Sequence, residues 1–237
     1  MKKLNLSSIE PKPVLIVGSV AFDNIITPHA TGERILGGSA SYAALATSYY
    51  APARLVGVVG HDFDEKHIHR FRAHDIDIEG LQRDESGPTF FWKGKYHENF
   101  NKRDTIDIQL NVFENFRPEL PNNYRDSEYL MLGNIAPGLQ LHVLEQIANT
   151  KPYVLADTID LWIDIQKDEL LQVVSKVNLF VINDSESEQL TGEKNIILAG
   201  KKLLELGTEA AIIKKGEHGA YLFHSDGLFA LPAYPGT

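Results

Sequence analysis

The sequence predicts an α/β fold, in which a doubly wound, mainly parallel sheet carries helices on both faces and a small antiparallel β flap. Two observations predict it. Short apolar, β-branched segments alternate with segments of helical periodicity along most of the chain, which is typical of parallel sheets buried between helices. Residues 89–112 break this alternation with two segments of period two and no helix between them, which is typical of antiparallel strands solvated on one face.

The alternation can be followed element by element. Residues 13–20 and 54–60 are expected to be strands, and the alanine-rich residues 39–51 between them a helix. Beyond the flap, strands are expected at residues 128–133, 153–156, 179–182, 210–213 and 220–223. Helices are expected between them at residues 139–148, 161–176, from 184 onward and at 196–206.

The flap is expected to be an insertion at about residues 86–115 within one domain spanning residues 1–237, because no repeat or low-complexity linker divides the chain. Its strands are assigned to residues 89–96 and 105–112. Its aromatic side chains, Phe91, Trp92 and Tyr96, are expected to cover another part of the domain or a bound ligand.

Composition excludes several classes of function. The chain has no run of about 18 apolar residues that could span a bilayer, and residues 1–8 lack the apolar core of a secretion signal. A cytoplasmic protein without a membrane partner is therefore expected. The absence of cysteine rules out disulfides, thiolate metal sites and a cysteine nucleophile. A formal net charge of −9 repels phosphates, so no nucleic-acid partner is expected.

Polar residues follow the predicted strands at the place where ligands bind in open parallel sheets, the crevice outside the carboxyl ends of the strands. These residues are Asp23, Asn134, Asp157, Asn183 and the Lys-Lys-Gly run at 214–216. Asn and Asp are also favoured in turns, because their side chains bond the local backbone. For the set as a whole we favour a binding site.

Two motifs admit both a structural and a functional interpretation. Gly37 and Gly38 precede a helix and could let the backbone approach a ligand closely, or the serines that follow them could simply cap that helix. Asn183 and Glu186 open a helix directly after a buried strand. There they could hold hydrated Mg²⁺ or phosphate, or form a capping box, and both can hold at once.

Other candidate motifs favour structural interpretations. Residues 215–219 (KGEHG) are expected to be a hairpin turn, with glycines lying against a nucleotide as the alternative. His61, His67 and His69 lie among acidic residues, but positions i and i+2 do not share a helix face, so a solvated charged helix is expected rather than a metal site. The usual P-loop, dinucleotide-binding, serine-hydrolase and zinc-protease motifs do not occur, and phosphoryl transfer on another scaffold stays open.

The motifs follow one another in a distinctive order: GSVAFD at 18–23, the glycine pair at 37–38, VGVVGHD at 56–62, N-x-x-E at 183–186 and KKGEHG at 214–219. Each is common alone, whereas this order and spacing resemble the ribokinase-like PfkB carbohydrate kinases along essentially the whole chain. The resemblance implies a ribokinase-like fold in which the flap is a lid over the substrate.

The resemblance also implies roles on the substrate side. Asp23 would hydrogen-bond substrate hydroxyls, and Gly37 and Gly38 would let the main chain approach the sugar. Trp92 would lie in the lid, whose closure excludes water that competes for the phosphoryl group. Asn134, at the same edge of the sheet, is assigned to the substrate as well.

On the other side of the crevice the resemblance implies ATP and Mg²⁺. The residues that would border ATP are Asn183, Lys215, Gly216 and Gly219, and Glu186 would organise Mg²⁺. The family's G-A-G-D segment, whose aspartate activates the attacking hydroxyl, has no match. No catalytic residue is therefore assigned, the expected aspartate lies beyond Thr237, and the chain alone is expected to be inactive.

Two further departures concern the substrate. Residues 39–42 (SASY) replace the lysine and asparagine with which ribokinases contact ribose, so ribose is not assigned. Residues 156–162 (ADTIDLW) resemble a D-T-M-N-x-W pattern of some sugar-kinase relatives, with Asp160 in place of the asparagine.

The expected function is transfer of the γ-phosphoryl group of ATP to a hydroxyl of a small sugar. A nucleoside is the rival acceptor, because the aromatic lid could stack on a base. A non-catalytic sugar- or nucleotide-binding protein is the alternative from another class. The resemblance also implies a homodimer through the lid strands, as in some of these kinases, and an exposed edge strand makes this association physically plausible.

Overall fold

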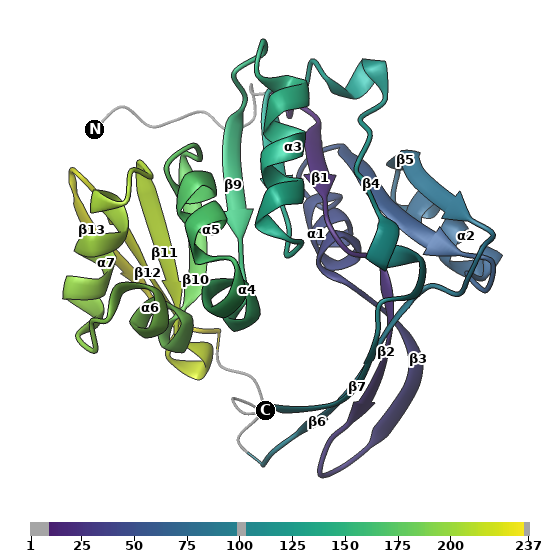
Figure 1. The fold of residues 1–237 in the computed structure, drawn as a ribbon, viewed down its shortest axis with the longest axis horizontal. Helices are drawn as coiled ribbons and strands as arrows, with labels where there is room; N and C mark the ends of the chain where they lie inside the picture. The colour runs from purple at the N-terminus through teal and green to yellow at the C-terminus, as the bar shows by residue number, and fades with distance from the viewer. Residues whose placement is uncertain (1–9, 99–102, 235–237) are drawn as a thin grey trace.

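The computed structural model describes residues 10–98 and 103–234, an α/β fold built on a nine-stranded sheet (Figure 1). Its strands, from one edge to the other, are β13 (Gly227–Leu231), β12 (Ala220–His224), β11 (Ala210–Lys214), β10 (Leu179–Asn183), β9 (Tyr153–Asp157), β8 (Tyr129–Leu132), β1 (Val14–Val17), β4 (Ala53–Gly60) and β5 (Ile76–Asp84). Neighbours from β5 to β11 are parallel, and β12 and β13 are added antiparallel. The predicted mainly parallel sheet is confirmed.

Helices lie on both faces of this sheet. Strand β1 illustrates why such a strand is apolar at every position. Leu15 and Val17 belong to one core cluster and Ile16 to another, because successive side chains of a strand point to opposite faces. The first cluster includes side chains of α3 (Pro137–Ile147), α4 (Asp160–Ile165), α5 (Lys167–Val174), α6 (Asp184–Thr191) and α7 (Ile196–Glu205). The second includes side chains of α1 (Ser39–Thr47) and α2 (Glu65–Ala73).

The second face is packed by α1 and α2 beside β1, β4 and β5. Toward the β13 edge an apolar row crosses the same face, and its successive members pair in register: Val181, Ile212, Leu222 and Phe229. The first three are half-buried and Phe229 is 59% exposed. This part of the sheet therefore presents apolar side chains to solvent in the described part of the chain.

A second sheet, which we call the lid, projects from the carboxyl-end edge of the large sheet (Figure 1). It has four strands in the order β3 (Thr31–Gly37), β2 (Ala21–Ile26), β6 (Phe90–Tyr96) and β7 (Arg103–Gln109). The pair β2–β6 is parallel and the other two pairs are antiparallel. The sequence predicts β6 and β7, whereas β2 and β3 extend the lid beyond residues 86–115. The tip of the predicted flap, residues 99–102, lies outside the described residues.

Three other expectations need correction. The strand expected at 105–112 ends at Gln109, because Asn111 has a left-handed φ of 51° and starts a 3₁₀ turn, Asn111–Asn115. The helix expected at 161–176 is divided at Gln166, whose φ of −138° is not helical. Strands β5 and β13 were not predicted, because both are edge strands whose burial pattern is irregular or exposed.

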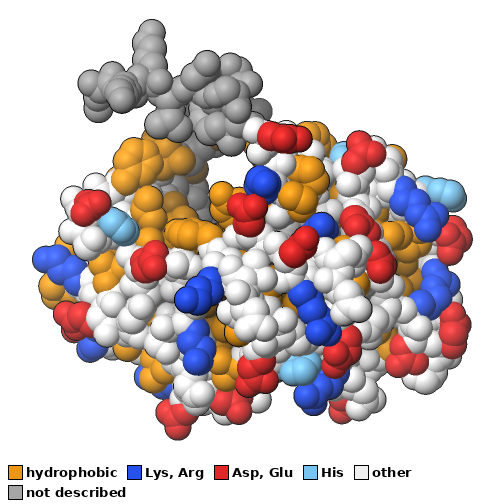
Figure 2. Space-filling model, turned by 90° about the horizontal axis from the view of Figure 1, so that it is seen from above, with side chains coloured by type: hydrophobic (Ala, Val, Ile, Leu, Met, Phe, Trp, Pro, Cys, Tyr) orange, Lys and Arg blue, Asp and Glu red, His pale blue; other side chains and the backbone are white. Residues whose placement is uncertain are grey.

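The surface of the described residues gives two further observations. None of the helices is long and apolar enough to cross a membrane in the described ranges, 10–98 and 103–234. On the face seen in Figure 2, basic side chains stand singly among acidic ones and form no continuous stripe.

Candidate active site

The candidate site lies where the lid meets the carboxyl ends of the parallel strands. Residues that the sequence places after different strands come to this edge: Asp23 on β2, Asn134 after β8, Asp157 and Asn183 at the ends of β9 and β10, and Lys214 at the end of β11. Parallel strands bring their carboxyl ends to one edge of the sheet, so this convergence follows from the fold itself.

Asp23 lies on the lid against a glycine that leaves room for its carboxylate. A Cβ added at Gly37 would collide with all three outer atoms of the Asp23 carboxylate. Burial raises the pKa of Asp23 to about 6 from its ordinary value of 3.8. Within the described residues no cation pairs with this half-buried carboxylate, and substrate hydroxyls are donors that would satisfy it.

Gly38 has a structural role of its own. Its φ of 92° favours glycine, and a Cβ there would collide with the carbonyl of Ser19. The expected serine cap from within the helix is not found, because the Ser39 N–H donates to the Ser19 hydroxyl at 3.0 Å. Gly38 thus lets the start of α1 pack directly on the segment that leads into the lid.

One face of the lid carries a row of paired residues that includes Asp23. Ile35, Asp23, Trp92 and Ile108 pair in register across the four strands, so their side chains share one face. The Trp92 ring lies over Gly94, and its Nε1 donates to the Thr105 hydroxyl at 3.2 Å. Ile35 is 39% and Ile108 is 52% exposed. We call this row, the residues 35, 23, 92 and 108, the lid row.

Phe91 does not belong to this face. It pairs with Phe22, and both pack in the core cluster that contains α1 and α2, on the opposite side of the lid. The expectation that Phe91 covers the ligand together with Trp92 and Tyr96 is therefore wrong for Phe91, since successive strand residues point to opposite faces.

Tyr42 is a site residue to which the sequence analysis gave no role. It lies in the first turn of α1, is 55% exposed, and its pKa is raised by burial and by the nearby Asp23 and Tyr96. Its hydroxyl is thus near both the carboxylate and the lid. The signal available in the sequence was its position just after the glycine pair.

Asn134 is oriented by Trp162, whose Nε1 donates to the Asn134 Oδ1 at 2.8 Å. This contact joins two sequence motifs, because Trp162 ends the ADTIDLW segment. With Oδ1 engaged by Trp162, the amide N–H groups of Asn134 keep donor capacity for a ligand. Its role in substrate binding stays a prediction.

Asn183 and Glu186 form the capping box that the sequence allowed. The Glu186 N–H donates to the Asn183 Oδ1, and the Asn183 N–H donates to the Glu186 Oε2, both at 2.8 Å. Glu186 is only 7% exposed, and burial raises its pKa despite the bond from Asn183 and the nearby Lys214. Its second oxygen keeps acceptor capacity for a cation.

Asp157 and Lys214 add a second carboxylate and a cation beside Glu186. The Lys214 Nζ lies 3.4 Å from the Asp157 Oδ1. Burial raises the pKa of Asp157, although Lys214 opposes the shift. The sequence analysis named both as crevice residues without a role, because only the fold shows that β9 and β11 flank β10.

This cluster fits hydrated Mg²⁺ better than a cage built from protein ligands alone. Within the described residues no group of three or more His, Asp or Glu is placed to hold a metal by itself. Mg²⁺ is usually bound through one or two carboxylates together with waters and substrate phosphates. The buried Glu186 and the half-buried Asp157, two carboxylates at one edge of the sheet, fit that pattern.

The loop that begins at Lys215 is a hairpin turn, as expected. Its Lys215 N–H donates to the Gly219 carbonyl at 2.7 Å, and β11 and β12 pair antiparallel on either side. Gly216 and Gly219 have φ of 53° and 90°, and a Cβ at Gly219 would collide with the Leu231 carbonyl. The glycines are thus explained by the turn. Lys215 lies 3.9 Å from Asp184, and both line a cavity of about 230 Å³ at the start of α6.

The helix that carries His67 and His69 is not fully solvated. His67 is 4% exposed and packs against the rings of Phe22 and Phe63. Burial is the main cause that lowers its pKa. The expectation of a solvated helix is therefore wrong at His67. This residue lies one turn before Phe71 and next to Ile68, on the face of α2 that packs against the core.

Fold, lid and crevice together define an α/β protein of ribokinase-like architecture. A family model described as pfkB family carbohydrate kinase matches residues 14–237, so the chain belongs to this family. The members and relatives of this family that we compare are kinases, and the expectation that the chain alone is inactive has no support in these comparisons. The expected catalytic aspartate, beyond Thr237, lies outside the described residues.

Among curated proteins, the chain is 26% identical over 227 residues to a cytidine kinase of Thermococcus kodakarensis, covering 94% of this chain and 79% of that protein. Among solved structures, it is similar to a Burkholderia thailandensis nucleoside kinase in complex with inosine, with a TM-score of 0.76 and 19% identity over 93% of this chain and 76% of that one. It is also similar to an Arabidopsis thaliana ribokinase complexed with ribose and ATP, with a TM-score of 0.73 and 17% identity over 95% and 79%. These two likenesses show the fold.

Proposed function

We propose that the protein transfers the γ-phosphoryl group of ATP to a hydroxyl of a sugar moiety. The observation that carries this proposal is the placement of a half-buried carboxylate, Asp23, on the lid at the edge where Asp157, Glu186 and Lys214 gather. Within the described residues Asp23 has no cationic partner. The Asp23 carboxylate is suited to accept hydrogen bonds from hydroxyl groups. The set formed by Asp157, Glu186 and Lys214 is suited to phosphates and a divalent cation.

In this reaction the acceptor oxygen forms a bond to the γ-phosphorus, the bond from that phosphorus to the β,γ-bridging oxygen breaks, and ADP leaves. The proton of the hydroxyl passes to a general base, for which the aspartate expected beyond Thr237 stays a prediction. When bound, Mg²⁺ would neutralise charge that develops on the phosphates. Asp157 and Glu186 would hold its hydration shell, Lys214 would face phosphate oxygens, and Asp23 would orient the acceptor.

A nucleoside is the acceptor class that the lid row favours over a free small sugar. Ile35, Trp92 and Ile108 flank Asp23 on one face, so a polyol bound at Asp23 has apolar and aromatic surface on either side of it. A planar base attached to a ribose would use that surface by stacking, whereas a lone pentose would leave most of it uncovered. Similarity to a cytidine kinase supports the same class.

Replacing Trp92 with alanine separates the two acceptor classes. We expect kcat/KM for a nucleoside to fall about tenfold, because stacking on an aromatic side chain is worth roughly 1–3 kcal/mol per base. The value for the free pentose should change little, and Trp92→Phe should retain most of the nucleoside activity. An equal loss for both acceptors in steady-state kinetics would refute the base-stacking role.

The proposed reaction is tested by acceptor-dependent release of ADP from ATP, measured across pentoses, hexoses and nucleosides with and without Mg²⁺. We expect turnover with at least one acceptor and none when Mg²⁺ is chelated. Saturable binding of an acceptor or of ATP without turnover would favour the non-catalytic binding protein instead.

We also propose that two chains associate through their lids. The strands β3 and β7 are the edges of the four-stranded lid, and the exposed Ile106 and Ile108 lie on β7. Molar mass by sedimentation at several concentrations measures this association, and a monomer at all of them would refute it.

A further inference from the structure

Arg34 contacts both sequence neighbours of Asp23. It lies on β3, the strand paired with β2, and its backbone N–H donates to the Asn24 Oδ1 at 2.7 Å. Its guanidinium lies over the Phe22 ring, 4.1 Å from the ring centre. The residues immediately before and after Asp23 are therefore both held by this one arginine.

These contacts coincide with an irregularity in the lid. The β2–β3 register shifts between Asp23 and Ile25, where Asp23 pairs with Ile35 and Ile25 pairs with Gly32. Arg34 lies within the extra segment of β3 and has a left-handed φ of 47°. Bulges of this kind bend a strand and redirect the neighbouring side chain. The direction of the Asp23 carboxylate thus depends on how the bulge at Arg34 is held.

The other end of Arg34 is tied to the body of the protein. Its two terminal nitrogens donate to the Asp62 Oδ2, both at 3.2 Å, and one also donates to the Asp62 carbonyl at 3.1 Å. Asp62 lies in the loop between β4 and α2. A planar guanidinium that makes several hydrogen bonds to one partner fixes its orientation relative to that partner, which the ammonium group of a lysine cannot do.

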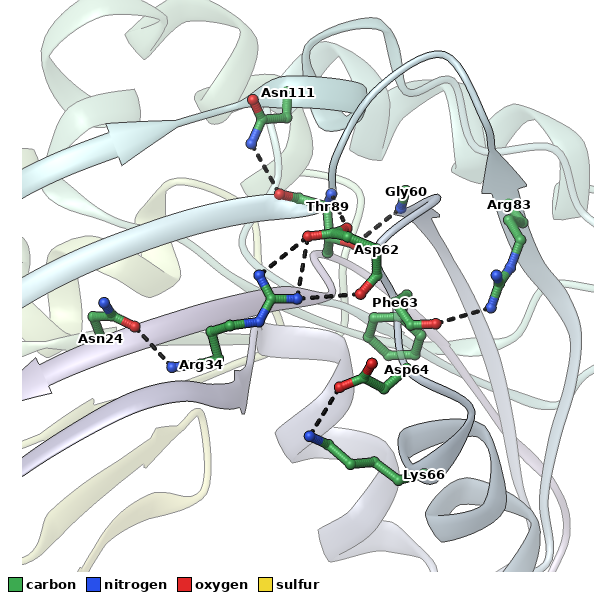
Figure 3. Close-up of polar contacts among 10 residues, drawn as sticks. All are labelled: Asn24, Arg34, Gly60, Asp62, Phe63, Asp64, Lys66, Arg83, Thr89 and Asn111. Carbon is green, nitrogen blue, oxygen red and sulfur yellow. Dashed lines mark hydrogen bonds and ion pairs between the residues drawn. The ribbon is translucent and has the colours of Figure 1, made fainter.

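Asp62 in turn holds the root of the lid strand β6, as Figure 3 shows. Its Oδ1 accepts bonds from the N–H of Thr89 at 2.7 Å and from the Thr89 hydroxyl at 2.8 Å. That hydroxyl accepts from the Gly60 N–H at 3.0 Å, and the Thr89 carbonyl accepts from Asn111 at 2.9 Å. Asp62 therefore connects the loop after β4 with two lid segments, β3 through Arg34 and the root of β6 through Thr89.

We propose that Arg34 is a positioning residue that sets the angle of Asp23 by fastening the lid bulge to Asp62. The proposal rests on the proposed function, in which Asp23 binds the acceptor hydroxyls. Arg34 itself does not touch the substrate in this account. Its side chain is 49% exposed, and exposed ion pairs contribute little to stability. Stabilisation of the fold alone would therefore not account for the contacts of Arg34 with Asp62 and with the neighbours of Asp23.

The chain supplies a matched control in Arg54. This arginine also lies over an aromatic ring, that of Tyr124 at 5.3 Å, and pairs with an aspartate, Asp126 at 2.9 Å. It lies at the amino-terminal end of β4, at the opposite edge of the sheet from the crevice. Its side chain is more buried, at 21% exposure, so its loss should affect stability at least as much as loss of Arg34.

The test compares Arg34→Ala, Arg34→Lys and Arg54→Ala by acceptor and ATP kinetics and by amide hydrogen exchange. We expect Arg34→Ala to raise KM for the acceptor about tenfold, because misplacing a substrate-binding group weakens positioning, with KM for ATP unchanged. Arg34→Lys should show an intermediate increase, and Arg54→Ala should show none. Exchange in β2 and β3 should become faster in Arg34→Ala alone.

Each result decides the matter. An unchanged acceptor KM in Arg34→Ala, an equal rise in KM for ATP, or the same effect in Arg54→Ala would overturn the positioning role. If the wild-type protein phosphorylates no acceptor, the proposed function fails separately. Hydrogen exchange then decides alone: faster exchange of β2 and β3 in Arg34→Ala supports the fastening of the bulge, and unchanged exchange overturns it.

Discussion

Replacing Asp23 with asparagine is expected to lower kcat/KM for the acceptor by about 100-fold, because hydrogen bonds to a charged group in a buried site are worth roughly 1.5–3 kcal/mol. The KM for ATP should stay near its wild-type value. The control is Asp107→Asn, since Asp107 pairs with Lys93 and so lies on the lid face opposite to Trp92. Steady-state kinetics with both substrates measure the effect. An Asp23→Asn variant with wild-type acceptor kinetics would remove Asp23 from the site.

The same substitution should make the protein more stable at neutral pH. Burial raises the pKa of Asp23 from 3.8 to about 6, so between these values the folded state binds a proton that the unfolded state has released. The free energy of unfolding therefore falls as the pH rises from about 4 to about 6. Asparagine cannot lose a proton, so thermal unfolding at pH 7 should show a higher Tm for Asp23→Asn than for wild type. A lower Tm would contradict the unpaired state of this carboxylate.

Acceptor binding should also follow the titration of Asp23. Only the ionised carboxylate accepts hydrogen bonds at both oxygens, so we expect KM for the acceptor to rise as the pH falls below about 6. The Asp107→Asn control should keep this dependence.

Replacing Glu186 with glutamine is expected to reduce kcat by about 10- to 100-fold and to raise the Mg²⁺ concentration needed for half-maximal activity, as loss of a group that orients a metal's ligands does. Glutamine can also occupy this position of a capping box, so the start of α6 should be kept. The matched control is Glu205→Gln, an exposed glutamate at the end of α7. If wild type, Glu186→Gln and Glu205→Gln all needed the same Mg²⁺ concentration for half-maximal activity, a metal role for Glu186 would be excluded.

Much of the large sheet was predictable because its inner strands are apolar runs with at least one buried face. Runs such as residues 14–17 and 210–213 are apolar throughout, and the helices between them keep an apolar face. The edge strands escaped prediction for the opposite reason. β13 is exposed along its whole length, so it has no buried face whose pattern could mark it.

The lid was only half predicted, because its two missing strands carry no alternating pattern of their own. In β2 the residues from Asp23 to Ile26 are all half-buried, and β3 contains the bulge around Arg34. Short irregular strands of this kind are specified by their partners across the sheet. The parallel pairing of β2 with β6 joins segments far apart in the sequence, which a local pattern cannot show.

For the site, the sequence identified residues at strand ends but not their partners. Asp23, Gly37 and Glu186 follow from position and residue type, and the structure adds the collision that explains Gly37. The roles of Tyr42 and Arg34, and the pairing of Lys214 with Asp157, depend on which segments the fold brings together. Gly219 shows the reverse case, because a motif glycine is accounted for by its contact with the Leu231 carbonyl.

The most direct test of the central claim is ³¹P NMR of the full-length protein mixed with ATP, Mg²⁺ and a nucleoside. The account predicts that the γ-phosphate signal of ATP is replaced by equal amounts of ADP and a phosphate monoester coupled to protons of the acceptor's sugar carbon. Inorganic phosphate alone, or unchanged ATP with every nucleoside and sugar supplied, would contradict phosphoryl transfer to a sugar hydroxyl.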